Sequence, residues 1–136
     1  MDDARFIFQT APSFYACYDP DIASVYMTWR GYHTSALFRV ENEEVLEVIA
    51  KHRARKILCD IRYFVLIGAT DQDWLNAEWL PRAIDAGLRT CAMVAPVFYF
   101  NKVAVQTIAD RVDPQALTIE YFDSPELARR WLTSIP

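Results

Sequence analysis

The sequence predicts one α/β domain over residues 1–136, with a mixed sheet in which antiparallel strands come first and parallel strands follow. Three observations support this prediction. Short aromatic runs separated by turn residues occupy the N-terminal part, short apolar runs alternate with helix-like patterns after Gly31, and no linker, repeat or low-complexity segment interrupts the chain. Because 53% of the 136 residues are hydrophobic, the chain can bury a core without disulfides or metal.

The N-terminal part has the pattern of strands. Residues 6–8, 14–18 and 24–29 are rich in aromatic or β-branched side chains. Asp19-Pro20-Asp21 lies between the second and third of these runs and is a turn signal. We therefore expect the second and third strands to pair as an antiparallel hairpin.

After Gly31 the apolar residues recur with the period of a helix. Residues 37–49 carry apolar side chains at helical spacing with acidic residues between them, and Thr34 or Ser35 is the expected N-cap. Residues 57–61 form a short apolar run with charged flanks, which is typical of a central strand buried on both faces. Residues 62–69 are expected to form the loop that follows.

The next helix is predicted from its start signal and its stop signal. Thr70 with Asp73 three residues later resembles a capping box, and the helix is expected to run through Trp79. Pro81 has no backbone N–H group, so we expect it to break or kink this helix, and Gly87 is a good helix stop. A buried strand is expected over residues 90–95.

The remaining elements continue the alternation. Residues 101–112 have helical spacing, residues 117–122 have the pattern of a strand, and Ser124 with Pro125 marks the start of a last helix. Strands that alternate with helices imply right-handed crossovers and a parallel sheet core covered by helices.

The composition excludes several classes of function. With 14 basic and 18 acidic residues the net charge is -4, which argues against binding to a nucleic-acid backbone. Gly31, Gly68 and Gly87 lie too far apart for a phosphate-binding loop, which excludes dinucleotide and P-loop sites. The histidines and cysteines form no pair with zinc-ligand spacing, so we expect no metal and no cofactor.

The cysteines and the apolar runs indicate a location. Cys17, Cys59 and Cys91 are an odd number in strand-like runs, which fits a reducing compartment better than a secreted disulfide scaffold. The N-terminal residues lack the pattern of a signal peptide, and the apolar runs are too short to span a bilayer. The expectation is a bacterial-type cytoplasmic protein.

Neither histidine indicates an enzyme. His33 has no accompanying nucleophile signature, and it is expected to be a surface or capping residue. His52 lies at the expected end of a helix, where the helix dipole favours a positive charge.

The order of elements resembles the STAS domain, the fold of anti-sigma-factor antagonists, and in particular small bacterial STAS-like proteins of unassigned function. The resemblance covers about residues 14–134 and implies a single STAS-like domain without catalytic activity. It is carried by Trp29-Arg30-Gly31, Ile57-Leu58-Cys59-Asp60, Asp71-Gln72-Asp73-Trp74-Leu75, Leu80-Pro81-Arg82, Tyr121-Phe122-Asp123 and residues 128–132.

The resemblance implies one candidate modification site. In phosphoregulated STAS members a serine at a helix start, in an Asp-Ser-Ser-Gly-like loop, is phosphorylated by a partner kinase. Gly68-Ala69-Thr70-Asp71 falls at that loop, which makes Thr70 the candidate phosphosite. The helix dipole would favour a phosphate there, whereas Asp71 and Asp73 would repel it. The alternative, which the residues favour, is that Thr70 caps the helix.

The best polar cluster consists of Asp60, Arg62, Asp71 and Asp73. Ligands of open α/β sheets bind beyond the carboxyl ends of the strands, so these residues could bind a cation or a polar metabolite, and two of the carboxylates could do acid–base work. The alternative is that Asp60 hydrogen-bonds a loop backbone and pairs with Arg62. The rule that buried charges are paired favours this alternative.

Aromatic residues gather in two connections between strands and helices. Residues 97–100 and 63–67 include Tyr63, Phe64, Phe98, Tyr99 and Phe100, and Trp74 follows in the next helix. Three consecutive aromatics cannot all face one core, so these loops predict an apolar working surface. It would be a protein interface, with another protein or in a homodimer, or the mouth of a lipophilic pocket. A loop folded back over the core is the structural alternative.

The sequence therefore predicts a non-enzymatic regulatory or protein-interaction module of STAS-like type. A carrier of a lipophilic small molecule is the second hypothesis, because the same aromatic loops could form a pocket and because STAS domains are similar to the lipid-binding CRAL-TRIO architecture. A small hydrolase that uses Asp60 and Asp71 is the third.

Overall fold

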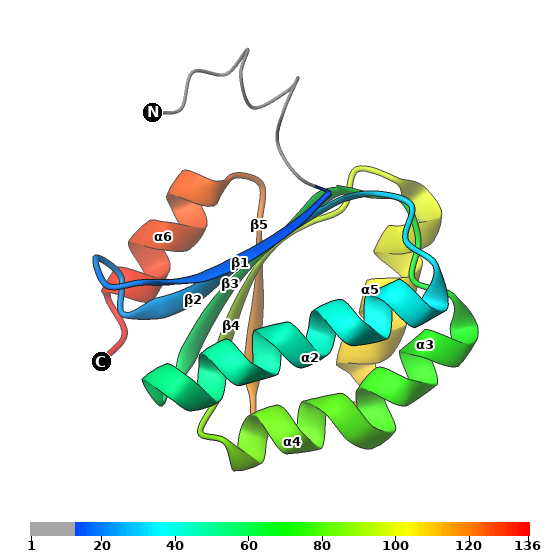
Figure 1. The fold of residues 1–136 in the computed structure, drawn as a ribbon. Coiled ribbons are helices and arrows are strands. Elements are labelled where there is room, and N and C mark those ends of the chain that lie inside the picture. The colour runs from blue at the N-terminus through cyan, green and yellow to red at the C-terminus, as the bar shows by residue number, and fades with distance from the viewer. Residues whose placement is uncertain (1–12) are drawn as a thin grey trace.

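The computed structural model describes residues 13–136 and confirms the α/β class with a mixed sheet (Figure 1). The strand expected over residues 6–8 lies outside the described residues. The described elements are β1 Phe14–Asp19, β2 Ser24–Gly31, α2 Ser35–His52, β3 Lys56–Phe64, α3 Ala69–Trp74, the π-helical turn η1 Leu75–Trp79, α4 Leu80–Asp85, β4 Thr90–Val94, α5 Tyr99–Asp110, β5 Thr118–Phe122 and α6 Pro125–Thr133.

The five strands lie in the sheet in their order along the chain, β1-β2-β3-β4-β5. β1 and β2 pair antiparallel, with Phe14 opposite Trp29 and Asp19 opposite Ser24, which confirms the predicted hairpin. The other three pairs are parallel. The register between β2 and β3 shifts after Thr28, as in a β-bulge.

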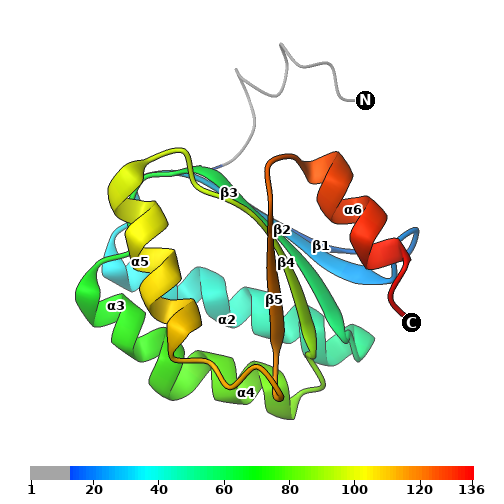
Figure 2. The ribbon, with the colours of Figure 1, turned by 180° about the vertical axis from the view of Figure 1, so that it is seen from behind.

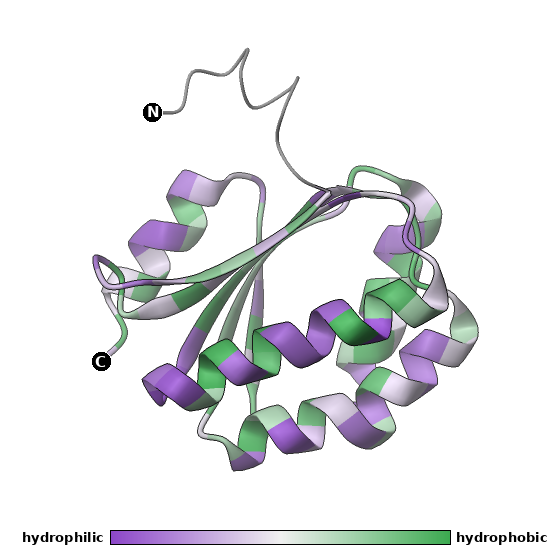
Figure 3. Ribbon diagram, in the orientation of Figure 1, coloured by the Kyte–Doolittle hydropathy of each residue, from purple (hydrophilic) through white to green (hydrophobic). Residues whose placement is uncertain are grey.

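Helices cover the two faces of the sheet unequally. α2, the α3–η1–α4 segment and α5 lie on one face, and α6 lies on the other (Figures 1 and 2). Each crossover adds its strand at the same edge of the sheet, and right-handed crossovers in one direction must all pass over the same face. The core on this face is the larger one, and Figure 3 shows helices of mixed hydropathy around it. A smaller core lies beneath α6 and contains Ile22, Leu58, Ala92, Val94, Ala128 and Leu132.

Two predicted caps are confirmed. The Thr34 Oγ1 atom accepts a hydrogen bond from the Leu37 amide at 3.2 Å, and α2 begins at the next residue, Ser35. The Ser124 Oγ atom accepts one from the Leu127 amide at 3.3 Å, with Pro125 in the first turn of α6. Both caps are local features, so the sequence alone could show them.

Two expectations about the middle of the chain are wrong, on the end of β3 and on the cap of α3. β3 continues to Phe64, so residues 62–64 belong to a strand and not to a loop. The break or kink expected at Pro81 is not contradicted, because a π turn interrupts the regular α-helix directly before α4, the helix that contains Pro81. The Leu80 amide donates to the Leu75 carbonyl five residues back, and α4 then runs on through Pro81. The N-cap of α3 is Gly68, so Thr70 lies inside the helix and does not cap it.

Candidate functional site

The strongest surface feature is a set of apolar side chains at the carboxyl ends of β3 and β4, which we call the aromatic edge. It consists of Tyr63, Val65, Leu66, Val97, Phe98, Tyr99 and Phe100. Tyr99 and Phe100 are 70% and 74% exposed, and their rings meet edge to face with centroids 5.4 Å apart. Exposed apolar patches on a monomer often mark an interaction site.

The aromatic edge is built on anchored loops. The Val97 amide donates to the Arg62 carbonyl at 3.0 Å, which ties the β4–α5 loop to the end of β3. Asn101, which is 0% exposed, accepts a hydrogen bond from the Ile67 amide at 2.9 Å and donates one to the Phe64 carbonyl at 3.0 Å. One side chain therefore fixes the start of α5 against the β3–α3 loop, and the two aromatic segments keep a defined relative position.

A pocket of about 350 Å³ lies beside the aromatic edge, between the β2–α2 and β3–α3 loops. We call it the edge pocket. Its polar lining is centred on Asp71, whose Oδ1 accepts hydrogen bonds from Ser35 Oγ at 2.7 Å and from Arg39 Nε at 3.0 Å. Its full lining is Tyr32, His33, Ser35, Phe38, Leu66, Ile67, Gly68, Ala69, Thr70 and Asp71. The volume lies at the lower end of the range for small-ligand pockets.

His33 is buried, so the expectation of a surface or capping residue is wrong. Its Nδ1 lies 2.7 Å from the Glu41 Oε1 atom, and its Nε2 lies 2.9 Å from the Arg30 carbonyl oxygen. The ring packs edge-on against Trp29 and Phe64, with centroids 5.3 and 5.2 Å away. Burial raises the pKa of Glu41 above its ordinary value, and the neighbouring His33 opposes that shift.

A second, interior cavity of about 100 Å³ lies between the sheet and the helices that cover it. Phe64 and Ile67 belong to its walls, but none of Phe98, Tyr99 and Phe100 does. Phe64 is buried against Trp29, so it belongs to the core and not to the aromatic edge. Trp74 is half-buried and packs against Phe38, and the Arg39 guanidinium lies over its ring, 5.2 Å from the ring centroid. Trp74 lines neither the edge pocket nor the interior cavity.

The predicted polar cluster is divided by the structure. Asp60 lies on the α6 face, where Arg62 binds it with two hydrogen bonds of 3.0 and 2.9 Å, and the Arg62 amide donates to it at 3.3 Å. Asp71 lies on the opposite face beside α2, and Asp73 pairs with Arg111 of the α5 C-cap at 3.0 Å. Each carboxylate therefore has its own arginine, as the structural alternative predicted for Asp60.

The division follows from the topology. A crevice at strand ends forms where neighbouring crossovers leave on opposite faces of a sheet. Here all three crossovers share one face, so a side chain of β3 on the α6 face cannot meet the α3 residues. Thr70 is exposed on the rim of the edge pocket, and the structure leaves its phosphorylation a prediction.

The residues that sequence reasoning missed lie on the buried stripe of α2 and at the start of α5. Glu41 and Asn42 lie on the same buried face of α2 as Phe38 and Val45, and this spacing was a signal that both needed buried partners. For Asn101 the sequence carried no comparable signal, because its partners are backbone groups of a distant loop.

Comparison of the chain with protein-family models, with curated proteins and with solved structures found no match. Among residues 13–136, no group of three or more His, Cys, Asp or Glu side chains is placed to hold a metal ion. No helix in this part of the chain is long and apolar enough to cross a membrane.

Proposed function

We propose that this protein is a non-enzymatic binding module of the STAS-like regulatory kind, and that it contacts another protein through the aromatic edge. The observation that supports the proposal is the exposure of Tyr99 and Phe100 at the start of α5, which Asn101 and the Val97 amide hold in place. Aromatic side chains dominate the energetics of protein interfaces, because they bury a large area with few rotatable bonds. Because these aromatic side chains are already held in position before a partner binds, they lose little conformational entropy on binding.

The edge pocket complements this surface. Leu66 belongs both to the aromatic edge and to the pocket lining, so a partner seated on the edge could place a side chain in the pocket. The Asp71 carboxylate on the pocket wall is already paired with Arg39, so the wall presents little free charge. An apolar or hydrogen-bonding side chain suits this pocket better than an ionic one.

A carrier of a lipophilic molecule remains the second candidate, and the interior cavity is the observation that favours it. Its volume of about 100 Å³ is well below the roughly 300–1,000 Å³ that pockets for drug-sized ligands have. A long acyl chain does not fit such a space, so a molecule carried there would have to be small. A hydrolase that uses Asp60 and Asp71 has no support, because the two carboxylates lie on opposite faces of the sheet.

Site-specific photo-crosslinking tests the proposal. The photoreactive residue p-benzoylphenylalanine replaces Phe100 in the full chain, and in a matched control it replaces Leu127, which is 44% exposed on α6. In host cells we expect a discrete adduct from position 100 and none from position 127. Equal adducts from both positions, or none from position 100, would contradict the proposal.

Sedimentation velocity separates the two kinds of partner. If the partner is a second copy, the protein dimerises as its concentration rises, and Phe100→Ser abolishes the dimer while Leu127→Ser does not. If the wild type stays monomeric at every concentration, self-association is excluded and the crosslinked adduct identifies a different protein. The same host material, digested and analysed by mass spectrometry, tests whether Thr70 carries a phosphate.

A further inference from the structure

The interior cavity has nearly uniform apolar walls. Strands β2 to β5 form its floor, and α2, η1, α4 and α5 form its roof. Met27 and Met93 lie in the middle of this floor, where they pack against the core and are half-buried. Close-packed protein interiors rarely keep a void of this size, since each lost contact costs stability.

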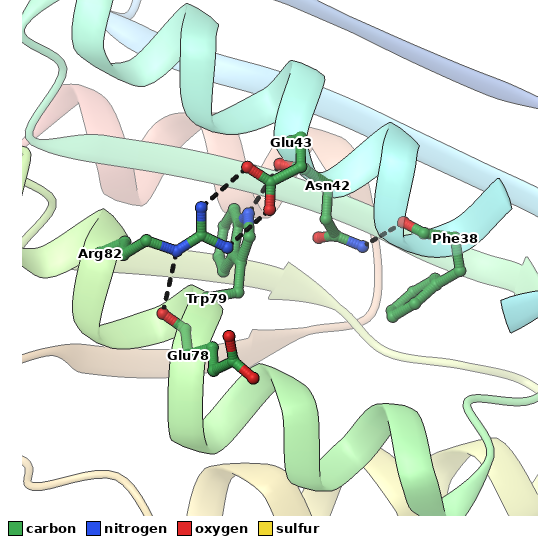
Figure 4. A network of polar contacts seen from close by, with 6 residues as sticks. All are labelled: Phe38, Asn42, Glu43, Glu78, Trp79 and Arg82. Carbon is green, nitrogen blue, oxygen red and sulfur yellow. Dashed lines mark hydrogen bonds and ion pairs between the residues drawn. The ribbon is translucent and has the colours of Figure 1, made fainter. Parts of the chain in front are cut away.

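The π turn η1 contributes two side chains to the roof of the cavity. Leu75 and Trp79, the first and last residues of η1, are both buried and line the cavity. Leu75 and Trp79 bound the π turn, so its wider backbone determines how these two side chains are placed in the roof. Single π turns frequently occur at functional sites of proteins. Hydrogen bonds also tie this segment to α2, because Arg82 binds Glu43 with contacts of 2.8 and 2.6 Å (Figure 4).

One polar atom in the cavity wall lacks a partner. Asn42 is 3% exposed and lines the cavity, and its Nδ2 atom donates to the Phe38 carbonyl at 2.9 Å. The Trp79 indole N–H donates at 2.6 Å to the backbone oxygen of Asn42 and not to its side chain. Among the described residues no donor reaches the Oδ1 atom, which points away from Phe38 in Figure 4. Asn42 therefore offers the cavity a single hydrogen-bond acceptor.

We propose that the interior cavity is a binding site for a small neutral aromatic molecule of the phenol class, with the ring between the sheet and η1 and the hydroxyl donating to Asn42 Oδ1. An apolar cavity of about 150 Å³ is known to stay dry and to bind benzene. This cavity is smaller, and the flexible thioethers of Met27 and Met93 can move to fit a ring. The proposal is independent of the aromatic edge.

The wall chemistry selects against the other occupants. A buried water needs two to four polar partners, and this cavity offers one acceptor beside the weakly polar Cys59 and Cys91 thiols. A carboxylate or an amine would bury a charge without a counter-ion. A hydrocarbon ring fits the apolar walls but leaves Asn42 Oδ1 without a donor.

Titration of the intact protein with phenol, toluene and benzoate tests the proposal. The probes have similar shapes and differ in one substituent. Methyl resonances of Met27 and Met93 report occupancy by NMR, and nuclear Overhauser contacts from the ring protons to these methyl groups locate the probe. We expect saturable phenol contacts and no benzoate binding. An absence of ring-to-methionine contacts at millimolar phenol would overturn the proposal, whatever the variants do.

Two variants test the parts of the site separately. Ala109→Leu places a larger side chain on α5 in the cavity, and because it fills a void it is expected to fold and to lose phenol binding. Asn42→Leu keeps the side-chain size but removes the acceptor. The ratio of phenol to toluene affinity should then fall about three- to tenfold relative to the wild type, as the loss of one hydrogen bond predicts.

A structural role for Asn42 alone would change both affinities together and leave their ratio unchanged. An unchanged ratio therefore overturns the assignment of Asn42, and full phenol binding in Ala109→Leu overturns the assignment of the cavity. Thr107→Ala, on the exposed face of α5, is the control variant and should bind all three probes like the wild type.

Discussion

The anchoring of the aromatic edge can be tested at a single side chain. Replacing Asn101 with alanine removes the acceptor of the Ile67 N–H group and the donor to the Phe64 carbonyl, and both groups lose their partner where Asn101 was fully buried. An unsatisfied buried polar group costs about 1–3 kcal/mol, so the two together predict a loss of about 2–5 kcal/mol in unfolding free energy. A domain of this size is stable by roughly 5–15 kcal/mol, so the variant should still fold.

Urea denaturation followed by tryptophan fluorescence measures this loss. Thr107→Ala is the matched control on the same helix, because its exposed hydroxyl donates only to the Val103 carbonyl, and it should change stability by no more than about 0.5 kcal/mol. Amide hydrogen exchange at Ile67 should also be faster in Asn101→Ala than global unfolding accounts for. A loss below about 1 kcal/mol, together with full protection of the Ile67 amide, would refute the role given to Asn101.

Three further predictions concern other contacts. The hydrogen bond from Arg82 lowers the pKa of Glu43, so this contact stabilises the fold above the ordinary pKa of 4.5 and is lost as the pH falls through the lowered value. Denaturation of Glu43→Gln should therefore show a deficit below about 1 kcal/mol at neutral pH, because the pair is exposed, and none in acid. Alkylation of the native protein followed by mass spectrometry should modify Cys17 before Cys59, because Cys59 is fully buried and its hydrogen bond with Cys91 raises its pKa. Lys56→Met should lower the unfolding free energy by about 2–4 kcal/mol, since the buried ammonium donates to the Leu132 and Ile135 carbonyls at 2.8 Å each, and exchange in α6 should rise most.

The elements of the fold could be predicted because their signals are local. The Thr34 and Ser124 caps and the alternation of strands with helices depend on neighbouring residues, and the structure confirms them. The end of β3 was missed because the charged Arg62 directly follows the apolar run 57–61 and was assigned to the next loop. In the structure Asp60 and Arg62 form an ion pair. Residues two positions apart lie on the same face of a β-strand, so this pair can form within β3.

The site was predicted less well, because its key contacts join distant parts of the chain. The sequence predicted the aromatic residues of the two loops, and it could not show that Asn101 ties one loop to the other over 34 residues. His33 was misplaced for the same reason, since the sequence does not show that its side chain meets Glu41 on the buried face of α2. The grouping of Asp60 with Asp71 failed because residues close in sequence came to lie on opposite faces of the sheet.

The order of the strands has a consequence for how the chain can fold. Among residues 13–136 each strand pairs only with its neighbours in sequence, so the described sheet can grow from β1 to β5 during synthesis, and no strand depends on a later one. α6 is the exception. Arg129 of α6 donates a hydrogen bond to Asp19, which lies 110 residues earlier in the chain. Lys56 donates one to the Leu132 carbonyl of α6, which lies 76 residues later. Of the described elements α6 is therefore the last to pack, and until it does the smaller core beneath it stays open.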